Sequence, residues 1–289
     1  MSADDDPRDA LELAGWRIGP ELGRGAMGVV HAATDRVTGE PCAVKLIRGG
    51  PAVTGHVARE VENSRSLDHP NIVRAFAHGD AAGTPFVVME LCADGSLARR
   101  VAERGPLPAA EAVPLLLDVL RGLEHAHTAP VTATDAGGER VPVTGLVHRD
   151  VKPANVLLAG ARAKLADFGL AKAFQLAGLS GLTHTGSAGG TPAFMPRRQV
   201  LDYKYATPDV DVWAAAACLY YALTGHPPRD FPPGRDPWLV VWRSEPVPVA
   251  ARGVPVPARL AALLDEALAE GSEPRFPTAA GLRVALEAL

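Results

Sequence analysis

The chain has 289 residues, of which 47% are hydrophobic and 21% charged, and its formal net charge is −4. This balance is ordinary for a globular protein and calls for neither nucleic acid nor an anionic membrane as a partner. The three cysteines are far apart without a C-x-x-C, which excludes a disulfide framework or zinc site and favours a cytoplasmic location. The N-terminus is acidic, and the longest apolar run, Val212–Leu223, is too short to cross a bilayer, so neither a signal peptide nor a membrane segment is predicted. The many glycines and prolines hint at a GC-rich bacterial genome.

The first element with chemical meaning is a glycine-rich stretch near the N-terminus. Residues 1–14 are expected to form a flexible leader, and Leu22–Val30 then reads L-G-R-G-A-M-G-V-V, a G-x-G-x-x-G-x-V pattern. Glycines allow backbone amides to approach phosphate oxygens without obstruction by side chains. A dinucleotide fingerprint should open a helix, whereas Val29–Ala33 continues as a strand. A glycine-rich hairpin without a ligand is the remaining alternative.

Two charged residues follow in segments that are predicted to be ordered. Lys45 stands in Cys42–Leu46, a short apolar strand. Gly55–Leu67 reads as a helix with two valines four positions apart on one face. Glu60 lies beside these valines and is expected to point inward, whereas Glu62 would face away from them.

Three longer segments come next. Pro85–Cys92 is predicted to be an apolar strand that runs into a turn. Ala109–Thr128 is predicted to be a long amphipathic helix, and His127 on its apolar stripe is interpreted as a packed residue rather than a ligand. Residues 129–144 are rich in Thr, Gly, Pro and Val and are predicted to form a surface hairpin around residues 135–138, with an inert loop as the default role.

The stretch Val147–Leu158 reads V-H-R-D-V-K-P-A-N-V-L-L and carries groups suited to phosphoryl transfer. A carboxylate (Asp150) can orient a hydroxyl nucleophile, an ammonium (Lys152) can neutralise a phosphoryl group, and an amide oxygen (Asn155) can bind a hard cation. A D-F-G tripeptide beginning at Asp167 follows behind a short predicted strand. A charged surface turn ahead of a strand is the alternative interpretation.

The chain resembles eukaryotic-like (Hanks-type) bacterial serine/threonine protein kinases. It carries four of their motifs in the same order: the glycine motif, the lysine strand, H-R-D-x-K-P-x-N and D-F-G. The resemblance covers the chain from residue 16 to its end. It implies an α+β, bilobal protein-kinase fold with a small β-rich N-lobe containing helix C (residues 15–91) and a larger, mainly α-helical C-lobe (92–289). Residues 129–144 would be an insertion before the catalytic loop, and residues 167–198 the activation segment.

The resemblance implies a non-specific serine/threonine protein kinase that uses ATP and Mg²⁺, with Mn²⁺ as a second option. Asp150 would position the substrate hydroxyl and accept its proton, and Lys152 would stabilise the transferred phosphoryl group. Thr191 would bond both of these side chains. Asn155 and Asp167 would hold the metal ion.

The nucleotide would be held mainly by the predicted N-lobe. By resemblance, Lys45 would contact the α and β phosphates, and Glu60 on helix C would pair with this lysine. The other implied nucleotide-contacting positions are Leu22, Gly23, Gly25 and Gly28 in the glycine loop, Val30, Ala43 and Leu157 around adenine, and Met89, Glu90 and Cys92 in the segment linking the lobes.

Hydroxyl groups in the activation segment are candidates for regulation. Because Arg149 precedes Asp150, the chain resembles kinases whose activation loop is ordered by a phosphate that pairs with this arginine. We hypothesise that Thr183 and Thr185 are autophosphorylated in trans, which requires a transient homodimer. Ser180 and Ser187 are further acceptors, and a polar flexible loop is the alternative.

The pattern departs from the family after residues 190–195, which resemble the substrate-docking loop G-T-P-x-Y-M. Pro196–Arg198 stands where A-P-E is expected, although the arginine that normally pairs with its glutamate looks present as Arg275. The anchor must then be rebuilt, and the acidic candidates are Asp202, Glu245 and Glu273.

The remaining chain is predicted to be helical. Pro208–Thr224 matches helix F of the family, in which Asp211 would bond backbone amides of the catalytic loop. Two more helices are predicted near Pro257–Ala269 and Thr278–Leu289.

Two alternatives to an active protein kinase remain. The altered A-P-E region favours a pseudokinase that acts as a nucleotide-binding or scaffold module. A small-molecule phosphotransferase of related fold would usually lack both the catalytic-loop lysine and the docking-loop threonine. For an active kinase the expected partners are ATP and proteins with accessible serine or threonine.

Overall fold

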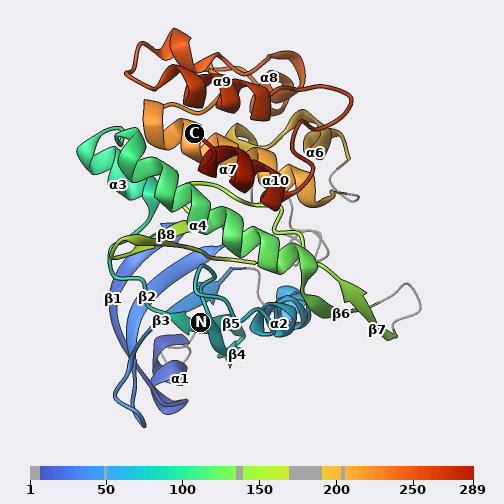
Figure 1. Ribbon diagram of the computed structural model, residues 1–289. Helices are drawn as coiled ribbons and strands as arrows, with labels where there is room; N and C mark the ends of the chain where they lie inside the picture. The colour runs from blue at the N-terminus through green and yellow to red at the C-terminus, as the bar shows by residue number, and fades with distance from the viewer. Residues whose placement is uncertain (1–6, 49–50, 135–138, 169–190, 203–205) are drawn as a thin grey trace. The chain divides into compact units, whose positions relative to one another are not determined.

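The structure, a computed structural model, describes residues 7–48, 51–134, 139–168, 191–202 and 206–289. The chain forms two compact units, an N-terminal unit rich in strands and a C-terminal unit that is mainly helical (Figure 1). The N-terminal unit contains the described residues up to Asp68, Val73–Ala93 and Phe168. The C-terminal unit contains His69–Ile72, Asp94–Asp167 and the described residues from 191 onward.

The N-terminal unit is built on a five-stranded antiparallel sheet with strand order β1-β2-β3-β5-β4. Consecutive strands pair as hairpins, except that a helix separates β3 from β4. The strands are β1 (Trp16–Gly25), β2 (Gly28–Asp35), β3 (Pro41–Ile47), β4 (Ala75–Ala81) and β5 (Thr84–Glu90).

The glycine motif forms the turn between β1 and β2, where Gly25 pairs with Gly28. Gly28 has φ +152°, and a Cβ atom there would lie 1.9 Å from the carbonyl oxygen of Leu46, so only glycine fits. At Gly23 and Gly25 an added Cβ would meet no atom within 4 Å. Packing within the described chain therefore demands glycine at the third position only, and the first two leave space beside the backbone.

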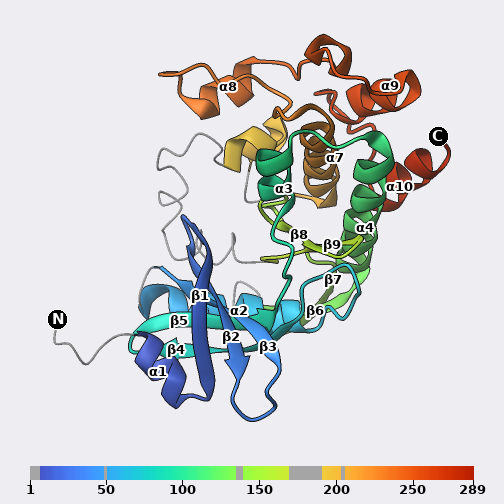
Figure 2. The same ribbon diagram turned by 90° about the vertical axis from the view of Figure 1, so that its left-hand side faces the viewer.

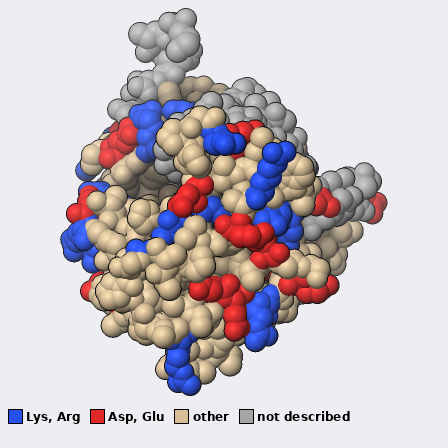
Figure 3. All heavy atoms as spheres, turned by 90° about the horizontal axis from the view of Figure 1, so that it is seen from above, with Lys and Arg blue, Asp and Glu red and all other residues tan. Residues whose placement is uncertain are grey.

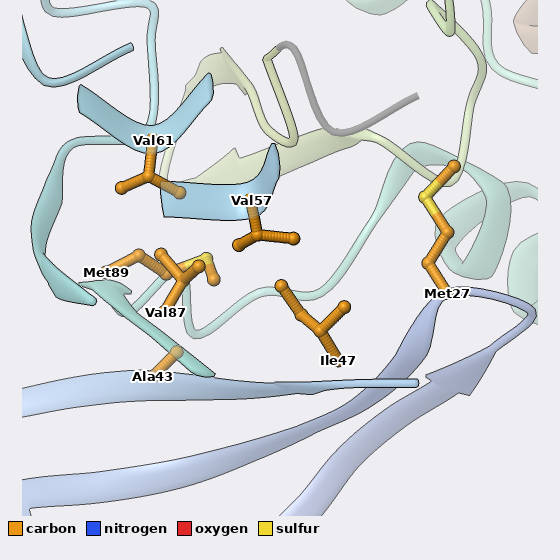
Figure 4. Close-up of a cluster of buried hydrophobic side chains, with 7 residues drawn as sticks. All are labelled: Met27, Ala43, Ile47, Val57, Val61, Val87 and Met89. Carbon is orange, nitrogen blue, oxygen red and sulfur yellow. The ribbon is translucent and has the colours of Figure 1, made fainter. Parts of the chain in front are cut away.

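Helix α2 (Pro51–Arg65) packs on the sheet through a buried apolar cluster, shown in Figure 4. Val57 and Val61 meet side chains from β3 and β5, and the predicted orientation of the two glutamates is confirmed. Glu60 is only 4% exposed, whereas Glu62 is exposed and lies 3.0 Å from a guanidinium nitrogen of Arg65. The buried members of the cluster are Met27, Ala43, Ile47, Val57, Val61, Val87 and Met89.

One local prediction for this part of the chain is wrong. Helix α1 (Pro7–Leu13) occupies the second half of the expected flexible leader, because Leu11 is completely buried in a second apolar cluster of the sheet. Further along the chain, Ile72 makes an isolated bridge to Leu165 within the C-terminal unit, ahead of the start of β4 at Ala75.

The C-terminal unit is organised around α7 (Pro208–Thr224), whose residues are nearly all buried (Figure 2). A helix that is apolar on all sides must be covered by its neighbours, and α4 (Ala109–Thr128) and α10 (Ala279–Glu287) do so. The bounds predicted for α4 and α7 are confirmed. The other elements are α3 (Leu97–Arg104), the β8–β9 hairpin (Val156–Ala159 and Arg162–Leu165), α6 (Arg197–Leu201), α8 (Pro237–Arg243), α9 (Ala258–Ala267) and two 3-10 turns (Thr191–Phe194 and Val249–Arg252).

The predicted insertion is a two-stranded antiparallel ribbon, as expected. Strands β6 (Pro130–Thr134) and β7 (Arg140–Thr144) pair along their whole length, and residues 135–138 between them lie outside the described chain. Val131 is buried, whereas Val143 is 38% exposed.

The surface of the C-terminal unit carries charges of both signs. Lysine and arginine side chains alternate with aspartate and glutamate on the face drawn in Figure 3. Among the described helices, none combines the length and the apolar character that a bilayer crossing requires.

Candidate active site

The catalytic-loop sequence is held in place by the carboxylate of Asp211, from the first turn of α7. Its oxygens accept hydrogen bonds from the backbone amides of His148 (2.7 Å) and Arg149 (2.8 Å). Oδ2, the oxygen that accepts from His148, also contacts Nε2 of His127 at 2.9 Å, and Asp211 is only 1% exposed. The predicted structural role of Asp211 is therefore confirmed, and His127, interpreted from the sequence only as a packed residue, is its second partner.

The imidazole of His148 connects the loop to the strand that leads to Asp167. Its Nδ1 atom lies 3.2 Å from the amide nitrogen of Asp150 and its Nε2 atom 2.8 Å from the carbonyl oxygen of Ala166. Both bonds form when the ring proton is on Nε2. The backbone of Asn155 adds a further link, because its carbonyl accepts from the amide of Ala166 at 2.9 Å. These bonds fix the spacing between the loop and D-F-G.

The carboxylate of Asp150 is buried and bonded on one side only. Its Oδ2 atom accepts hydrogen bonds from Nζ of Lys152 (2.7 Å) and from Nδ2 of Asn155 (3.1 Å). No described residue donates a hydrogen bond to the buried Oδ1 atom. A buried acceptor without a partner is costly, so Oδ1 is suited to accept a hydrogen bond from a hydroxyl group that enters the site.

Asn155 and Asp167, the two predicted metal ligands, carry oxygen atoms of the kind that a hard metal ion prefers. Nδ2 of Asn155 also donates to the carbonyl of Asp150 at 2.9 Å, so this amide is oriented by its nitrogen and its oxygen is left for other ligands. No group of three or more His, Cys, Asp or Glu side chains in the described residues could hold a metal alone. This donor set fits Mg²⁺, which binds one or two protein oxygens together with phosphates and water.

Burial raises the pKa of the Cys218 thiol, and the Asp150 carboxylate raises this pKa further. The thiol therefore stays protonated at neutral pH and is no nucleophile.

The predicted phosphate-binding lysine and its glutamate are both enclosed in the N-terminal unit. Lys45 is 5% exposed and Glu60 is 4% exposed. Residues on both sides of Lys45 in β3, Ala43 and Ile47, belong to the same apolar cluster as the valines that flank Glu60 in α2. The sheet and α2 therefore hold both charged side chains in one small core, where an isolated charge would be costly.

The predicted adenine-contacting residues are partly rigid and partly exposed. Met89 is buried in the apolar cluster, and Val30 is packed against it. The amide of Glu90 donates to the carbonyl of Arg74 at 2.9 Å, so a contact to adenine would have to use the Glu90 carbonyl. Cys92 and Leu157 on β8 are half-buried, and Ala43 is 4% exposed. Leu22, predicted to contact the nucleotide from the glycine loop, is 46% exposed on β1.

Several predicted residues fall outside the description. The candidate phosphorylation sites Thr183 and Thr185, with Ser180 and Ser187, lie in residues 169–190, which the structure does not describe. Thr191 begins a 3-10 turn, but its side chain is likewise outside the described part.

The arginines in place of A-P-E have found acidic partners. Nε of Arg198 lies 2.6 Å from a carboxylate oxygen of Asp209 at the start of α7. Nη2 of Arg197 lies 2.8 Å from Oε1 of Glu245, so this candidate is confirmed. Among the described residues, neither Asp202 nor Glu273 pairs with an arginine, and these two candidates were wrong.

Among the described residues, Arg275 takes no part in the ion pairs of Arg197 and Arg198. It pairs with Glu266 at 3.1 Å, and both side chains are more than half exposed. A different pair, Arg229 and Glu270, lies buried beside Arg197, and neither residue carries a motif that could have indicated it from the sequence.

Comparison with known proteins identifies the family. The family model described as "Protein kinase domain" matches residues 16–236. The chain belongs to this family. The expected bilobal protein-kinase fold is confirmed: a five-stranded antiparallel sheet with a helix in one unit, and a mainly helical second unit.

The most similar relatives include serine/threonine-protein kinases of actinobacterial species. PknB of Mycobacterium leprae is 31% identical over 283 residues and PknB of Mycobacterium tuberculosis 32%, each match covering 94% of this chain and 42% of the relative. A probable serine/threonine-protein kinase of Streptomyces coelicolor, SCO3848, is 30% identical over 286 residues, which cover 94% of this chain and 39% of that protein. The chain thus spans about two fifths of the length of these curated relatives.

A solved structure shares the fold. Rad53 residues 1–466, crystallised in complex with AMP-PNP, superposes with a TM-score of 0.72 at 24% identity, covering 94% of this chain and 65% of that one.

Replacing Asp211 by Asn should destabilise the C-terminal unit by about 3 kcal/mol, because a buried amide of the catalytic loop loses its charged acceptor. Equilibrium unfolding in urea measures the change. Asp202→Asn, an exposed site without a described ion pair, is the control and should shift the free energy of unfolding by less than about 0.5 kcal/mol. Equal effects of both substitutions would contradict the anchoring role.

Restoring the family's glutamate by Arg198→Glu should lower stability by about 1 kcal/mol, because the new carboxylate would face Asp209. Arg198→Gln removes the ion pair without adding repulsion and should cost less. Urea unfolding and kinase activity are measured together. A large gain in activity from Arg198→Glu would show instead that the native docking loop is impaired.

Proposed function

We propose that this chain is an active protein kinase domain that transfers the γ-phosphoryl group of ATP to serine or threonine hydroxyls of proteins. The observation that carries the proposal is the arrangement of Asp150. Lys152 and Asn155 hold one of its oxygens, and the other is buried without a partner among the described residues. An acceptor held in this way is suited to orient a substrate hydroxyl.

The residues of the catalytic loop support one chemical step. Oδ1 of Asp150 would accept the hydrogen bond of the substrate hydroxyl and then its proton, while the hydroxyl oxygen attacks the γ-phosphorus and ADP leaves. The ammonium of Lys152 would neutralise charge on the transferred group. Asn155 and Asp167 would hold Mg²⁺, which neutralises charge on the β and γ phosphates when bound. Most of the catalysis would come from positioning and electrostatic stabilisation.

Features of the N-terminal unit support nucleotide binding. Lys45 would contact the α and β phosphates with Glu60 holding it in place, and the glycine loop would bring backbone amides to the phosphates. The open space beside Gly23 and Gly25 is compatible with this approach. Adenine would lie against Val30, Ala43 and Met89, with the backbone of Glu90 and Cys92 at its edge. The AMP-PNP complex of Rad53, which shares the fold, is consistent with ATP as the donor.

The choice of serine and threonine rests on the relatives and on Lys152 and Thr191. The relatives are named serine/threonine-protein kinases. Autophosphorylation of Thr183 and Thr185 is part of the proposal. It draws support from Arg149, whose buried Nε atom has no hydrogen-bond partner among the described residues and could pair with a phosphate.

A pseudokinase that only binds nucleotide or partners is the second candidate. The sequence of Pro196–Arg198 favours it, because the family's docking-loop glutamate is absent. No phosphate-handling side chain is missing, however, and the arginines at these positions have partners.

Asp150→Asn should lower the rate of phosphoryl transfer to casein by about 10³-fold, because the amide cannot accept the proton. Binding of a fluorescent ATP analogue should stay within about threefold, since Asp150 makes no contact to the nucleotide base in this proposal. The control is Asp202→Asn, which should transfer at the wild-type rate. A wild-type protein that binds nucleotide without transfer would be a pseudokinase, and transfer unaffected by Asp150→Asn would exclude this mechanism.

Incubation of the wild-type protein with Mg²⁺ and ATP should place phosphate on Thr183 and Thr185, as phosphopeptide mapping by mass spectrometry will show. If the reaction occurs in trans, its initial rate per molecule should rise with protein concentration, and catalytically impaired Asp150→Asn should be phosphorylated by added wild type. If the protein is active but neither threonine carries phosphate, the proposed autophosphorylation of Thr183 and Thr185 is wrong.

A further inference from the structure

The end of the activation segment lacks the glutamate that kinases of this family pair with an arginine near the C-terminus. Pro196–Arg198 replaces A-P-E, and Arg275 forms an exposed ion pair elsewhere. We infer that a buried ion pair of Arg229 and Glu270 has taken over this positioning role and fixes Met195–Gln199. The inference deepens the proposed kinase function and rests on it for its effect on catalysis.

The pair lies in the interior of the C-terminal unit. Arg229 is completely buried and Glu270 nearly so, and Nη2 of the arginine bonds to Oε1 of the glutamate. Burial lowers the pKa of the Arg229 guanidinium, and the Glu270 carboxylate opposes this change. The guanidinium also lies 5.0 Å from the ring centroid of Trp213 on α7, and its Nε atom donates to the carbonyl of Ser244 at 3.0 Å. Every side of this charge therefore faces a fixed partner.

The two side chains hold the backbone on both sides of Pro196. Both carboxylate oxygens of Glu270 accept from the amide of Arg197, at 3.0 and 3.2 Å. Nη1 of Arg229 donates to the carbonyl of Met195 at 3.3 Å. Pro196 has no N–H group of its own, and the two side chains hold the carbonyl before it and the amide after it. The arginine and the glutamate act on the same turn.

The fixed turn is connected to the catalytic loop. Gln199, on α6 and 2% exposed, donates from Nε2 to the carbonyl of Arg149 at 2.7 Å. Arg149 precedes the catalytic Asp150 and has a positive φ of +66°, a conformation that needs support from its surroundings. A shift of the turn before α6 would therefore reach the catalytic loop through Gln199. Figure 1 shows α6 and α7 within the same unit.

A purely structural role for Arg229–Glu270 predicts something different. If the pair only filled the interior, its loss would loosen the whole unit. If it positions the turn, its loss should release residues 195–201 while α4 and α7 stay protected. The exposed pair of Arg275 and Glu266 offers a matched control, because it occupies the region where the family's arginine is expected.

The first experiment measures amide hydrogen exchange by mass spectrometry in wild type, Glu270→Gln and the control Glu266→Gln. Glu270→Gln keeps the side-chain volume and removes the charge. Exchange in peptides covering residues 195–201 should become at least about tenfold faster, and peptides of α4 should change less than about twofold. Glu266→Gln should leave both regions unchanged. Unchanged exchange at 195–201 in Glu270→Gln, or an equal effect of Glu266→Gln, would overturn the inference.

The second experiment measures steady-state kinetics on the same proteins. Glu270→Gln should raise KM for a peptide substrate by about tenfold while KM for ATP stays within about twofold, since the turn belongs to the peptide-docking segment. An equal rise of both KM values would contradict a positioning role. If the wild type transfers no phosphate at all, the proposed function fails, yet the exchange experiment still decides whether the pair fixes the turn.

A double variant covers the case in which Glu270→Gln does not fold. Replacing both charges by apolar groups, Arg229→Met with Glu270→Leu, leaves no unpaired buried charge and is expected to fold, with a cooperative thermal transition. Its peptides covering 195–201 should still exchange faster than those of the wild type. If residues 195–201 of the double variant exchange at the wild-type rate, or if the double variant also fails to fold, the Arg229–Glu270 pair does not position the turn. Either result would overturn the inference.

Discussion

The carboxylate of Asp211 is the interaction on which the candidate active site depends. It accepts two consecutive backbone amides of the catalytic loop and contacts His127, while it is almost completely buried in the most enclosed helix of the C-terminal unit. Two consecutive amides that donate to one carboxylate require an unusual backbone, and Arg149, the second of the two residues, indeed has a positive φ. Burial of the apolar surface of α7 stabilises this helix in the unit. The hydrogen bonds of Asp211 then hold the catalytic loop, and with it Asp150, at a fixed position relative to the helix.

A second polar network joins the catalytic loop to the segment that departs from the family pattern. Three neighbouring residues of α6 contact three different places: Arg197 reaches Glu245, Arg198 reaches Asp209, and Gln199 reaches the carbonyl of Arg149. The family's arrangement uses one glutamate and one arginine for this anchor. Here Arg197 and Arg198 form ion pairs with other acidic side chains. The glutamate is absent, but the sequence keeps every residue that is predicted to contact the phosphates. The replacement of A-P-E by Pro196–Arg198 is therefore only a weak argument against catalysis, although it lies in the docking segment.

Much of the fold could be predicted because its signals are local. The bounds of α4 and α7 follow from periodic or continuous apolar runs, and the orientation of Glu60 and Glu62 follows from helix geometry. Helix α1 was missed because a short polar segment has little helical preference of its own, and only the contact of Leu11 with the sheet makes it form. The local sequence of residues 7–13 does not indicate that Leu11 will be buried against strands that are distant in the sequence.

The sequence by itself determined the family, the order of the elements and the identity of the reactive groups, since motifs with fixed spacing can be read along one chain. Only the tertiary structure decided which polar groups meet. His127 and Asp211 are 84 positions apart, Gln199 and Arg149 are 50 apart, and Arg229 and Glu270 are 41 apart. Such pairs form because buried polar groups must find partners among whatever the fold brings near, and that neighbourhood exists only once the helices have packed.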